Sequence, residues 1–164
     1  FEGMTVLDNV MTGRLTHMKA SILDQAIWWG KARDEEMENR EIVEKVIDFM
    51  ELAPYRKSLV GNLSYGVQKR VEVARALTLD PELLLLDEPM AGMNIEEKED
   101  IVRFMFDLKK EWGITIVLVE HDLGVVMDIS DQIYVLDFGV VIGSGKPEDV
   151  ASDPKVIEAY IGEE

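Results

Sequence analysis

A run of four leucines at residues 83–86 ends directly in Asp87, Glu88 and Pro89. The run is too short for a helix, and continuous apolar runs of this length are typical of strands buried on both faces of a parallel sheet. Parallel strands need long crossover connections, usually helices, so the run also constrains its neighbours. The sequence therefore predicts an α/β fold that brings two carboxylates to the carboxyl end of a buried strand.

The segments that follow the leucine run alternate between helical and strand patterns. Strand, helix, strand, helix, strand in this order predicts one parallel sheet with right-handed crossovers. The expected elements are a helix begun by an Asn94–Glu97 capping box and stopped by Gly113, a strand over 114–119, a helix capped by Asp122, a strand over 132–137, a hairpin through Phe138 and Gly139, and two closing helices near Pro147 and Pro154.

The first half of the chain has helical periodicity instead. We therefore expect a helical subdomain over residues 1–80 and part of an α/β core over residues 81–164. The expected helices are 5–11, a stretch near Trp28 and Trp29, a helix that Asp34 caps and Pro54 ends, with a buried stripe of Ile42, Val43, Val46, Ile47 and Met50, and a helix over 67–79.

Composition excludes several kinds of partner and site. The formal net charge of −16, from 33 acidic and 17 basic residues, would repel nucleic acid and an anionic lipid surface, so no nucleic-acid partner is expected. The absence of cysteine excludes disulfides and thiolate metal sites and is compatible with the cytoplasm. No apolar stretch approaches the length of a membrane span.

The loop over residues 63–68 has the chemistry of a phosphate-facing helix start. Ser64 can cap the helix that follows, and Gly66 leaves its first turn open to close approach. Free backbone N–H groups and the helix dipole favour an anion there, and the side chains of Ser64 and Gln68 can add hydrogen bonds. A capping serine with a nearby glycine is commonplace by itself, and the acidic strand end twenty residues later is what favours the phosphate interpretation.

The two carboxylates at that strand end are expected to have different roles, because successive side chains on a strand point to opposite faces. Asp87 would hold Mg²⁺, through water, while Glu88 would orient and polarise the water that attacks a γ-phosphate. His121, at the end of the next predicted strand, could donate a hydrogen bond to the same phosphate.

Four stretches in this order resemble the motifs of ATP-binding-cassette (ABC) ATPases. LSYGVQ over 63–68 is similar to the family's signature, LLLLDEP over 83–89 to its Walker B strand with the catalytic Glu, and EHD over 120–122 to its switch histidine segment. The remaining stretch, Ala91, Gly92, Met93 and Asn94, resembles its D-loop. The tyrosine inside the signature, Asn94 where most relatives have Asp, and the ending VIEAYIGEE resemble the ATPase subunits of branched-chain amino-acid importers.

The resemblance implies a partial P-loop NTPase fold and an ATP- and Mg²⁺-dependent subunit paired with a second one. Ser64, Tyr65, Gly66 and Gln68 would then face a nucleotide held by the partner ATPase. Asp87, Glu88 and His121 would act on the chain's own nucleotide. Transmembrane permease subunits are the implied further partners, and they would hold the protein at the inner face of the cell membrane.

No GxxxxGK[ST] motif occurs in the sequence, so the loop that would cradle the phosphates is absent. The opening at Phe1 resembles the family just after its conserved Gln, and we expect the chain to be a fragment that lacks the Walker A motif and the N-terminal strands. Alone it should hydrolyse ATP negligibly, and an uncovered sheet edge should make it self-associate.

Two other functions fit the same motifs. One is a non-catalytic module that supplies a signature motif in trans to another subunit. The other is a chromosome-maintenance or repair ATPase, which would place long heptad coiled coils beside the signature, and the sequence contains none.

Overall fold

The computed structural model describes residues 1–17 and 31–161. Contacts divide the chain into two compact units, Phe1–Val117 and Leu118–Glu164. The helix expected near Trp28 lies outside the described residues. Over the described ranges, no helix combines the length and the apolar character that crossing a membrane requires.

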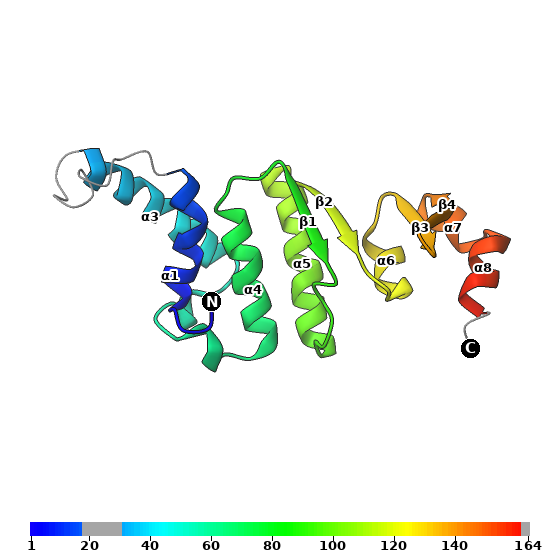
Figure 1. The fold of residues 1–164 in the computed structure, drawn as a ribbon, viewed down its shortest axis with the longest axis horizontal. Helices are drawn as coiled ribbons and strands as arrows, with labels where there is room; N and C mark the ends of the chain where they lie inside the picture. The colour runs from blue at the N-terminus through cyan, green and yellow to red at the C-terminus, as the bar shows by residue number, and fades with distance from the viewer. Residues whose placement is uncertain (18–30, 162–164) are drawn as a thin grey trace. The chain divides into compact units, whose positions relative to one another are not determined.

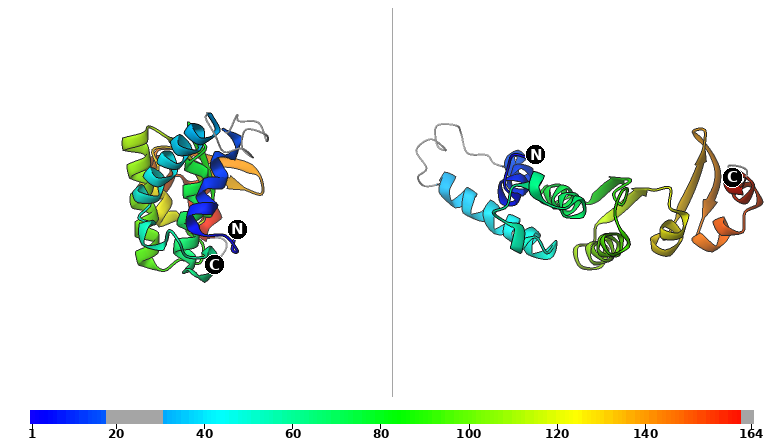
Figure 2. Two further views of the ribbon diagram at one scale, coloured as in Figure 1. Left: turned by 90° about the vertical axis from the view of Figure 1, so that its left-hand side faces the viewer. Right: turned by 90° about the horizontal axis from the view of Figure 1, so that it is seen from below.

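Helices α1 (Val6–Met11), α3 (Lys31–Phe49) and α4 (Tyr65–Leu77) pack side by side in the first unit, as Figures 1 and 2 show. Short 3-10 turns η1 (Thr12–Thr16), η2 (Ala53–Tyr55) and η3 (Val60–Asn62) connect them. Apolar side chains at helical spacing form their shared core; among the fully buried ones are Val6, Val10, Val43, Val46, Ile47, Met50, Val71, Ala74 and Leu77.

The predicted boundaries of α3 were wrong at both ends. Asp34 lies in the first turn of the helix and does not cap it, because the helix already begins at Lys31. An acidic residue in the first turn still interacts favourably with the helix dipole. The helix ends at Phe49, and Glu51 takes the left-handed conformation (φ 54°), so the chain has turned before Pro54. The predicted buried stripe is confirmed, with Ile42 half-buried at its margin.

After α4 comes the two-stranded sheet of β1 (Leu83–Asp87) and β2 (Thr115–Val119), which run in the same direction (Figure 1). The first unit contains β1 and the first three residues of β2. Helix α5 (Ile95–Trp112) connects them and lies along one face of the sheet (Figure 2). Its predicted capping box is present, and Gly113 ends it in the left-handed conformation. Leu84 packs with Phe104 and Leu108 of α5 in the main core.

The leucine run is buried on one face only, so the prediction of a strand covered on both faces was wrong. Leu83 and Leu85 are 51% and 69% exposed, whereas Leu84 is 5% exposed. Side chains alternate between the two faces of a strand, and α5 covers only the face that carries Leu84. The opposite face of β1 therefore presents apolar side chains that no described element of this unit covers.

The second unit contains α6 (Leu123–Ile129), β3 (Ile133–Asp137), β4 (Val140–Gly145), α7 (Pro147–Ala151) and α8 (Pro154–Ile161). β3 pairs with β4 as an antiparallel hairpin and not with β2, so the predicted single sheet of three parallel strands was wrong. The predicted hairpin turn is confirmed. Phe138 and Gly139 both have positive φ (42° and 79°), which matches the twist of a tight two-residue hairpin.

Candidate functional site

The 63–68 loop leads into α4 through a serine cap, as predicted. Ser64 has an extended backbone (φ −60°, ψ 156°), and its Oγ accepts a hydrogen bond from the Val67 N–H at 3.5 Å. Ser64 and Tyr65 are exposed, whereas Gly66 and Val67 are buried. The start of this 13-residue helix therefore lies at the surface, with its dipole favouring a negative group there.

The side chain of Glu97, from α5, already lies against this helix start. The Ser64 hydroxyl donates to Glu97 Oε1 at 3.4 Å. An added Cβ at Gly66 would lie 2.5 Å from the Glu97 carboxyl carbon, so Gly66 is small where this carboxylate packs. The sequence identified Glu97 only as part of a capping box, because residue spacing does not show that the starts of two helices meet.

Gln68 uses its amide within its own loop. Its Nε2 donates to the Leu63 carbonyl oxygen at 2.9 Å, and the side chain is half-buried. This bond closes the loop on itself and fixes the backbone around Ser64. Its expected direct contact with a partner's nucleotide stays a prediction.

Asp87 and Glu88 both lie exposed at the carboxyl end of β1, where the sequence placed them. Glu88 has a positive φ of 43°, a conformation that costs a non-glycine residue about 1 kcal/mol or more and that clusters at functional sites. Its carbonyl oxygen accepts the Ala91 N–H at 3.2 Å, so the chain turns immediately after the pair.

The donor set at this strand end fits a hard cation only in part. Within residues 1–17 and 31–161, no three His, Asp or Glu side chains gather closely enough to hold a metal ion by themselves. Mg²⁺ in nucleotide sites is commonly held by one or two carboxylates together with phosphate oxygens and waters. Asp87, exposed at the end of the strand, is compatible with that arrangement, in which the nucleotide supplies most of the ligands.

The 91–94 loop, composed of Ala91, Gly92, Met93 and Asn94, lies beside the 63–68 loop. Gly92 has φ +74°, which only glycine adopts without strain, and a Cβ placed there would be 3.5 Å from Tyr65 Cε1. Met93 is buried, and Asn94 caps α5. The structure therefore brings together two loops that are 23 or more positions apart in the sequence.

Lys69 lies over the exposed tyrosine of this junction, with Nζ 5.5 Å from the centre of the Tyr65 ring. A hydrogen bond to Glu72 raises the pKa of Lys69, and Tyr65 adds to the effect. Lys69 therefore places a positive charge near the start of α4, where it forms an ion pair with Glu72 at 3.0 Å.

His121 belongs to the second unit and is the second residue after the end of β2. Its side chain is 73% exposed, and its Nδ1 is 3.9 Å from Glu120 Oε2. Asp122 caps α6 by accepting the Val125 N–H at 3.3 Å, as predicted. The approach of His121 to the phosphate that Glu88 would serve stays a prediction.

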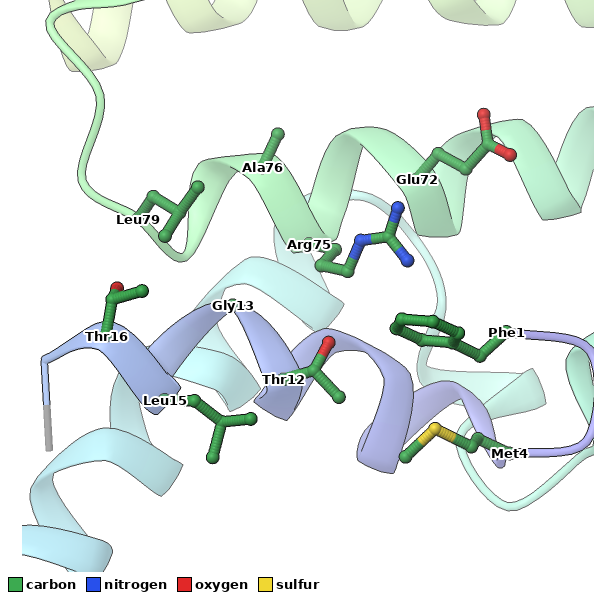
Figure 3. A pocket seen from close by; sticks show the side chains of 10 residues that line it. All are labelled: Phe1, Met4, Thr12, Gly13, Leu15, Thr16, Glu72, Arg75, Ala76 and Leu79. Atoms are coloured by element: carbon green, nitrogen blue, oxygen red, sulfur yellow. The ribbon is translucent and has the colours of Figure 1, made fainter.

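A shallow hollow of about 700 Å³ lies between the start of the chain, η1 and the end of α4 (Figure 3). None of the predicted site residues lines it. The guanidinium of Arg75 lies 5.1 Å from the centre of the Phe1 ring at its rim. Its lining residues are Phe1, Met4, Thr12, Gly13, Leu15, Thr16, Glu72, Arg75, Ala76 and Leu79.

Comparison with known families shows which family this chain belongs to. The model of the ABC transporter family matches residues 1–91, which is 91 of the 164 residues and includes the 63–68 loop, Asp87 and Glu88. The chain belongs to the ABC transporter family. A second model, described as branched-chain amino acid ATP-binding cassette transporter, matches residues 140–164 of this ABC chain.

Curated relatives agree with both models. The ABC chain is 34% identical over 163 residues to the high-affinity branched-chain amino acid transport ATP-binding protein BraF of Pseudomonas aeruginosa, covering 99% of the chain and 64% of the relative. Identity and coverage are the same for LivG of Escherichia coli. A probable LivG of Archaeoglobus fulgidus is 38% identical over 162 residues, covering 97% of the chain and 60% of the relative.

Solved structures support the fold. An ATP-binding cassette of an ABC transporter in its ADP conformation superposes with a TM-score of 0.79 at 34% identity, covering 98% of this chain and 64% of that one. A nucleotide-free cassette gives a TM-score of 0.78 at the same identity and coverage. The predicted partial ABC ATPase fold is therefore confirmed. The ABC chain spans less than two thirds of the length of these relatives.

Proposed function

We propose that this chain is the signature- and Walker B-bearing part of the ATP-binding subunit of an ABC importer for branched-chain amino acids. The observation that carries the proposal is the surface formed within one unit by the start of α4, the 91–94 loop and the end of β1. The ABC transporter model matches the start of α4 and the end of β1, and the relatives named above are branched-chain amino acid transport proteins.

The proposed roles follow from the chemistry of each group. Ser64 and the backbone N–H groups at the start of α4 would bind the γ-phosphate of a nucleotide held by a second ATPase subunit. Tyr65 and the 91–94 loop would lie against that subunit, and Gln68 would hold the loop in shape. The α4 start is exposed, as such a role requires.

The carboxylate pair would serve the nucleotide of the chain's own half. When bound, Mg²⁺ would neutralise part of the negative charge on the phosphate oxygens. Asp87 would hold that ion, Glu88 would orient the attacking water and accept its proton, and His121 would donate a hydrogen bond to the γ-phosphate. Exposure of Asp87, Glu88 and His121 is compatible with all three roles.

Transport partners and location follow as part of the same proposal. Two ATPase subunits would associate and bind transmembrane permease subunits, which places the protein on the inner face of the cell membrane. A solved cassette with a TM-score of 0.70 and 25% identity is described as dimeric, and that supports the pairing.

The decisive experiment joins the chain to a GxxxxGK[ST]-bearing N-terminal segment of a branched-chain amino acid relative and measures ATP hydrolysis. We expect hydrolysis in the joined protein, none with the 164-residue chain alone, and a loss of about 100-fold or more in kcat for Glu88→Gln. Glu82→Gln, an exposed carboxylate at the other end of β1, is the matched control. Equal rates for Glu88→Gln and its parent would refute the assigned role of Glu88.

A non-catalytic module that supplies only the 63–68 loop to another subunit is the second candidate. The start of α4 lies at the surface, with Ser64 and Tyr65 exposed, as such a module requires. The joined protein distinguishes the two, because only the first candidate requires it to hydrolyse ATP in a manner that depends on Glu88. A joined protein that does not hydrolyse ATP would identify the chain as such a module if the 164-residue chain also restores hydrolysis to an ABC ATPase whose own signature serine is replaced, and if Ser64→Ala abolishes that effect.

A further inference from the structure

Glu97 contacts both loops of the proposed nucleotide surface. Its Oε2 accepts the Asn94 N–H at 3.2 Å, and Asn94 Oδ1 in turn accepts the Glu97 N–H at 2.9 Å. Its other oxygen, Oε1, accepts the Ser64 hydroxyl at 3.4 Å. One carboxylate therefore joins the start of α5 to the start of α4.

Gly66 makes this bridge possible. Any larger residue would place a Cβ 2.5 Å from the carboxyl carbon of Glu97 and 2.8 Å from its Cγ. Real Cβ atoms do not approach other atoms so closely, so the carboxylate would have to leave. The glycine is in a helix at ordinary backbone angles, and the packing of Glu97 accounts for its small size there.

The two loops also approach each other at a point that does not involve Glu97. The ring of Tyr65 lies within van der Waals distance of the position that a Cβ would take on Gly92. Of these two approaches, only the one through Glu97 is a hydrogen bond, and it involves Ser64.

The 91–94 loop continues this connection to the carboxylate pair. The Ala91 N–H donates to the Glu88 carbonyl oxygen, and the Met93 N–H donates to that of Met90, both at 3.2 Å. These bonds form two overlapping turns over residues 88–93, and Asn94 follows directly. Glu88, at the other end of this short segment, has a positive φ.

From these contacts we infer that Glu97 is a positioning residue that links the 63–68 loop to the segment carrying Glu88. A phosphate that docks on Ser64 would change the Ser64–Glu97 bond, and Glu97 would carry the change to Asn94. The part of this inference that concerns phosphate rests on the proposed function. The link itself is a property of the chain.

The link is tested first by amide hydrogen exchange on the 164-residue chain, without nucleotide. Glu97→Ala should speed exchange of the Asn94 amide by about fivefold or more, because the amide loses its acceptor. Ser64→Ala and Gly66→Ala, both on α4, should also speed exchange at Asn94, and neither should add to the effect of Glu97→Ala in the double variant.

Matched substitutions separate the link from general loosening of α5. Glu96→Ala removes an exposed carboxylate from the same turn and should leave the Asn94 amide within about twofold of the parent. Glu97→Gln keeps a carbonyl acceptor and should restore most of the protection. If Ser64→Ala and Gly66→Ala both leave Asn94 unchanged, or if either is additive with Glu97→Ala, the link is refuted.

The second test uses the joined, P-loop-bearing protein. Glu97→Ala should lower kcat about tenfold while KM for ATP stays within about twofold, and Glu97→Gln should recover most of kcat. If the parent hydrolyses ATP and Glu97→Ala matches it in kcat, the positioning role fails and the proposed function stands. If the parent does not hydrolyse ATP, the proposed function fails, while the exchange experiment still decides the link.

Discussion

Arg14 Nη1 lies 2.6 Å from Asp80 Oδ2, across 66 residues of sequence. The same guanidinium is buried and donates to the Thr78 carbonyl oxygen at 2.9 Å and to Asn39 Oδ1 at 2.8 Å. It thereby joins η1 to α3 and to the end of α4. Asp80 has a positive φ of 51°, so Arg14 also holds the turn that leads into β1 and the carboxylate pair.

Arg14→Ala should lower the free energy of unfolding by about 2–4 kcal/mol, because it leaves a buried carbonyl and a buried amide oxygen without their donor. The free energy of unfolding of Arg14→Lys should lie between those of Arg14→Ala and the parent, since a lysine keeps the charge but cannot reproduce the forked geometry of the guanidinium. Urea unfolding followed by far-UV circular dichroism measures both. A loss below about 0.5 kcal/mol for the alanine variant would contradict the assigned role.

Gly13→Ala should be at least as disruptive as Arg14→Ala. A Cβ at Gly13 would collide with Thr78 Oγ1 and the Arg75 carbonyl oxygen, and the latter belongs to helix backbone that cannot rotate away. We expect a loss of about 3 kcal/mol or more, or failure to fold. Gly3→Ala is the control, because nothing lies within 4 Å of its added Cβ, and its unfolding midpoint should match that of the parent.

Helix caps and apolar periodicity in the sequence were enough to predict most of the local structure. Ser64, Asn94 and Asp122 cap the helices that their side chains and spacing predicted, because a cap is decided by a few neighbouring residues. The pairing of β3 was not predictable in this way. Its apolar residues suit either a parallel neighbour or the hairpin partner β4, and the choice depends on which strands are present to pair with.

The candidate site shows the same limit. The sequence placed Asp87 and Glu88 at a strand end and Ser64 at a helix start, since both positions follow from local pattern. It did not bring Glu97 to Gly66, or Tyr65 to Gly92, because those contacts depend on how α4 and α5 pack. The positive φ of Glu88 was missed for a related reason, as that conformation is imposed by the turn through Ala91.

Stability should depend on pH through Glu51, which lies just after α3 and forms an ion pair with Arg103 of α5. The hydrogen bond from Arg103 Nη1 to Glu51 Oε1, at 2.9 Å, lowers the pKa of Glu51, and Arg70 contributes while Asp100 and desolvation oppose. A carboxylate with a lowered pKa stabilises the fold above its unfolded value, about 4.3, and loses this contribution as pH falls through the folded value.

Arg103→Gln should therefore destabilise the chain at pH 7 and pH 5 more than near pH 3. Because Glu51 is half-exposed, the pH-dependent part should be below about 1 kcal/mol. Arg103→Gln also removes the contact of Arg103 with the Phe104 ring, at 4.7 Å. The stability lost with that contact is the same at all three pH values. Urea midpoints at the three pH values measure the difference, with Arg40→Gln on α3 as control. If the urea midpoints of Arg103→Gln and the parent differ by the same amount at all three pH values, the ion pair makes no pH-dependent contribution to stability and the prediction is wrong.

Self-association should occur through the open face of β1. Leu83 and Leu85 are both more than half exposed on the sheet face opposite α5, and β1–β2 is a short sheet with strand edges that can pair. We expect the 164-residue chain to form dimers or larger species at concentrations of about 100 µM, detected by sedimentation velocity. A clean monomer at that concentration would refute this expectation.

Leu85→Lys tests the surface directly, because a charge on the face cannot be buried against a second apolar sheet without a large desolvation penalty. Leu85→Lys should raise the dissociation constant for self-association by about tenfold or more. The packing of α5 on Leu84 should be unchanged. Leu15→Lys introduces the same charge at a 60% exposed leucine on η1 and should leave the association intact. Equal weakening by both variants would mean that added charge, and not the β1 face, controls the assembly.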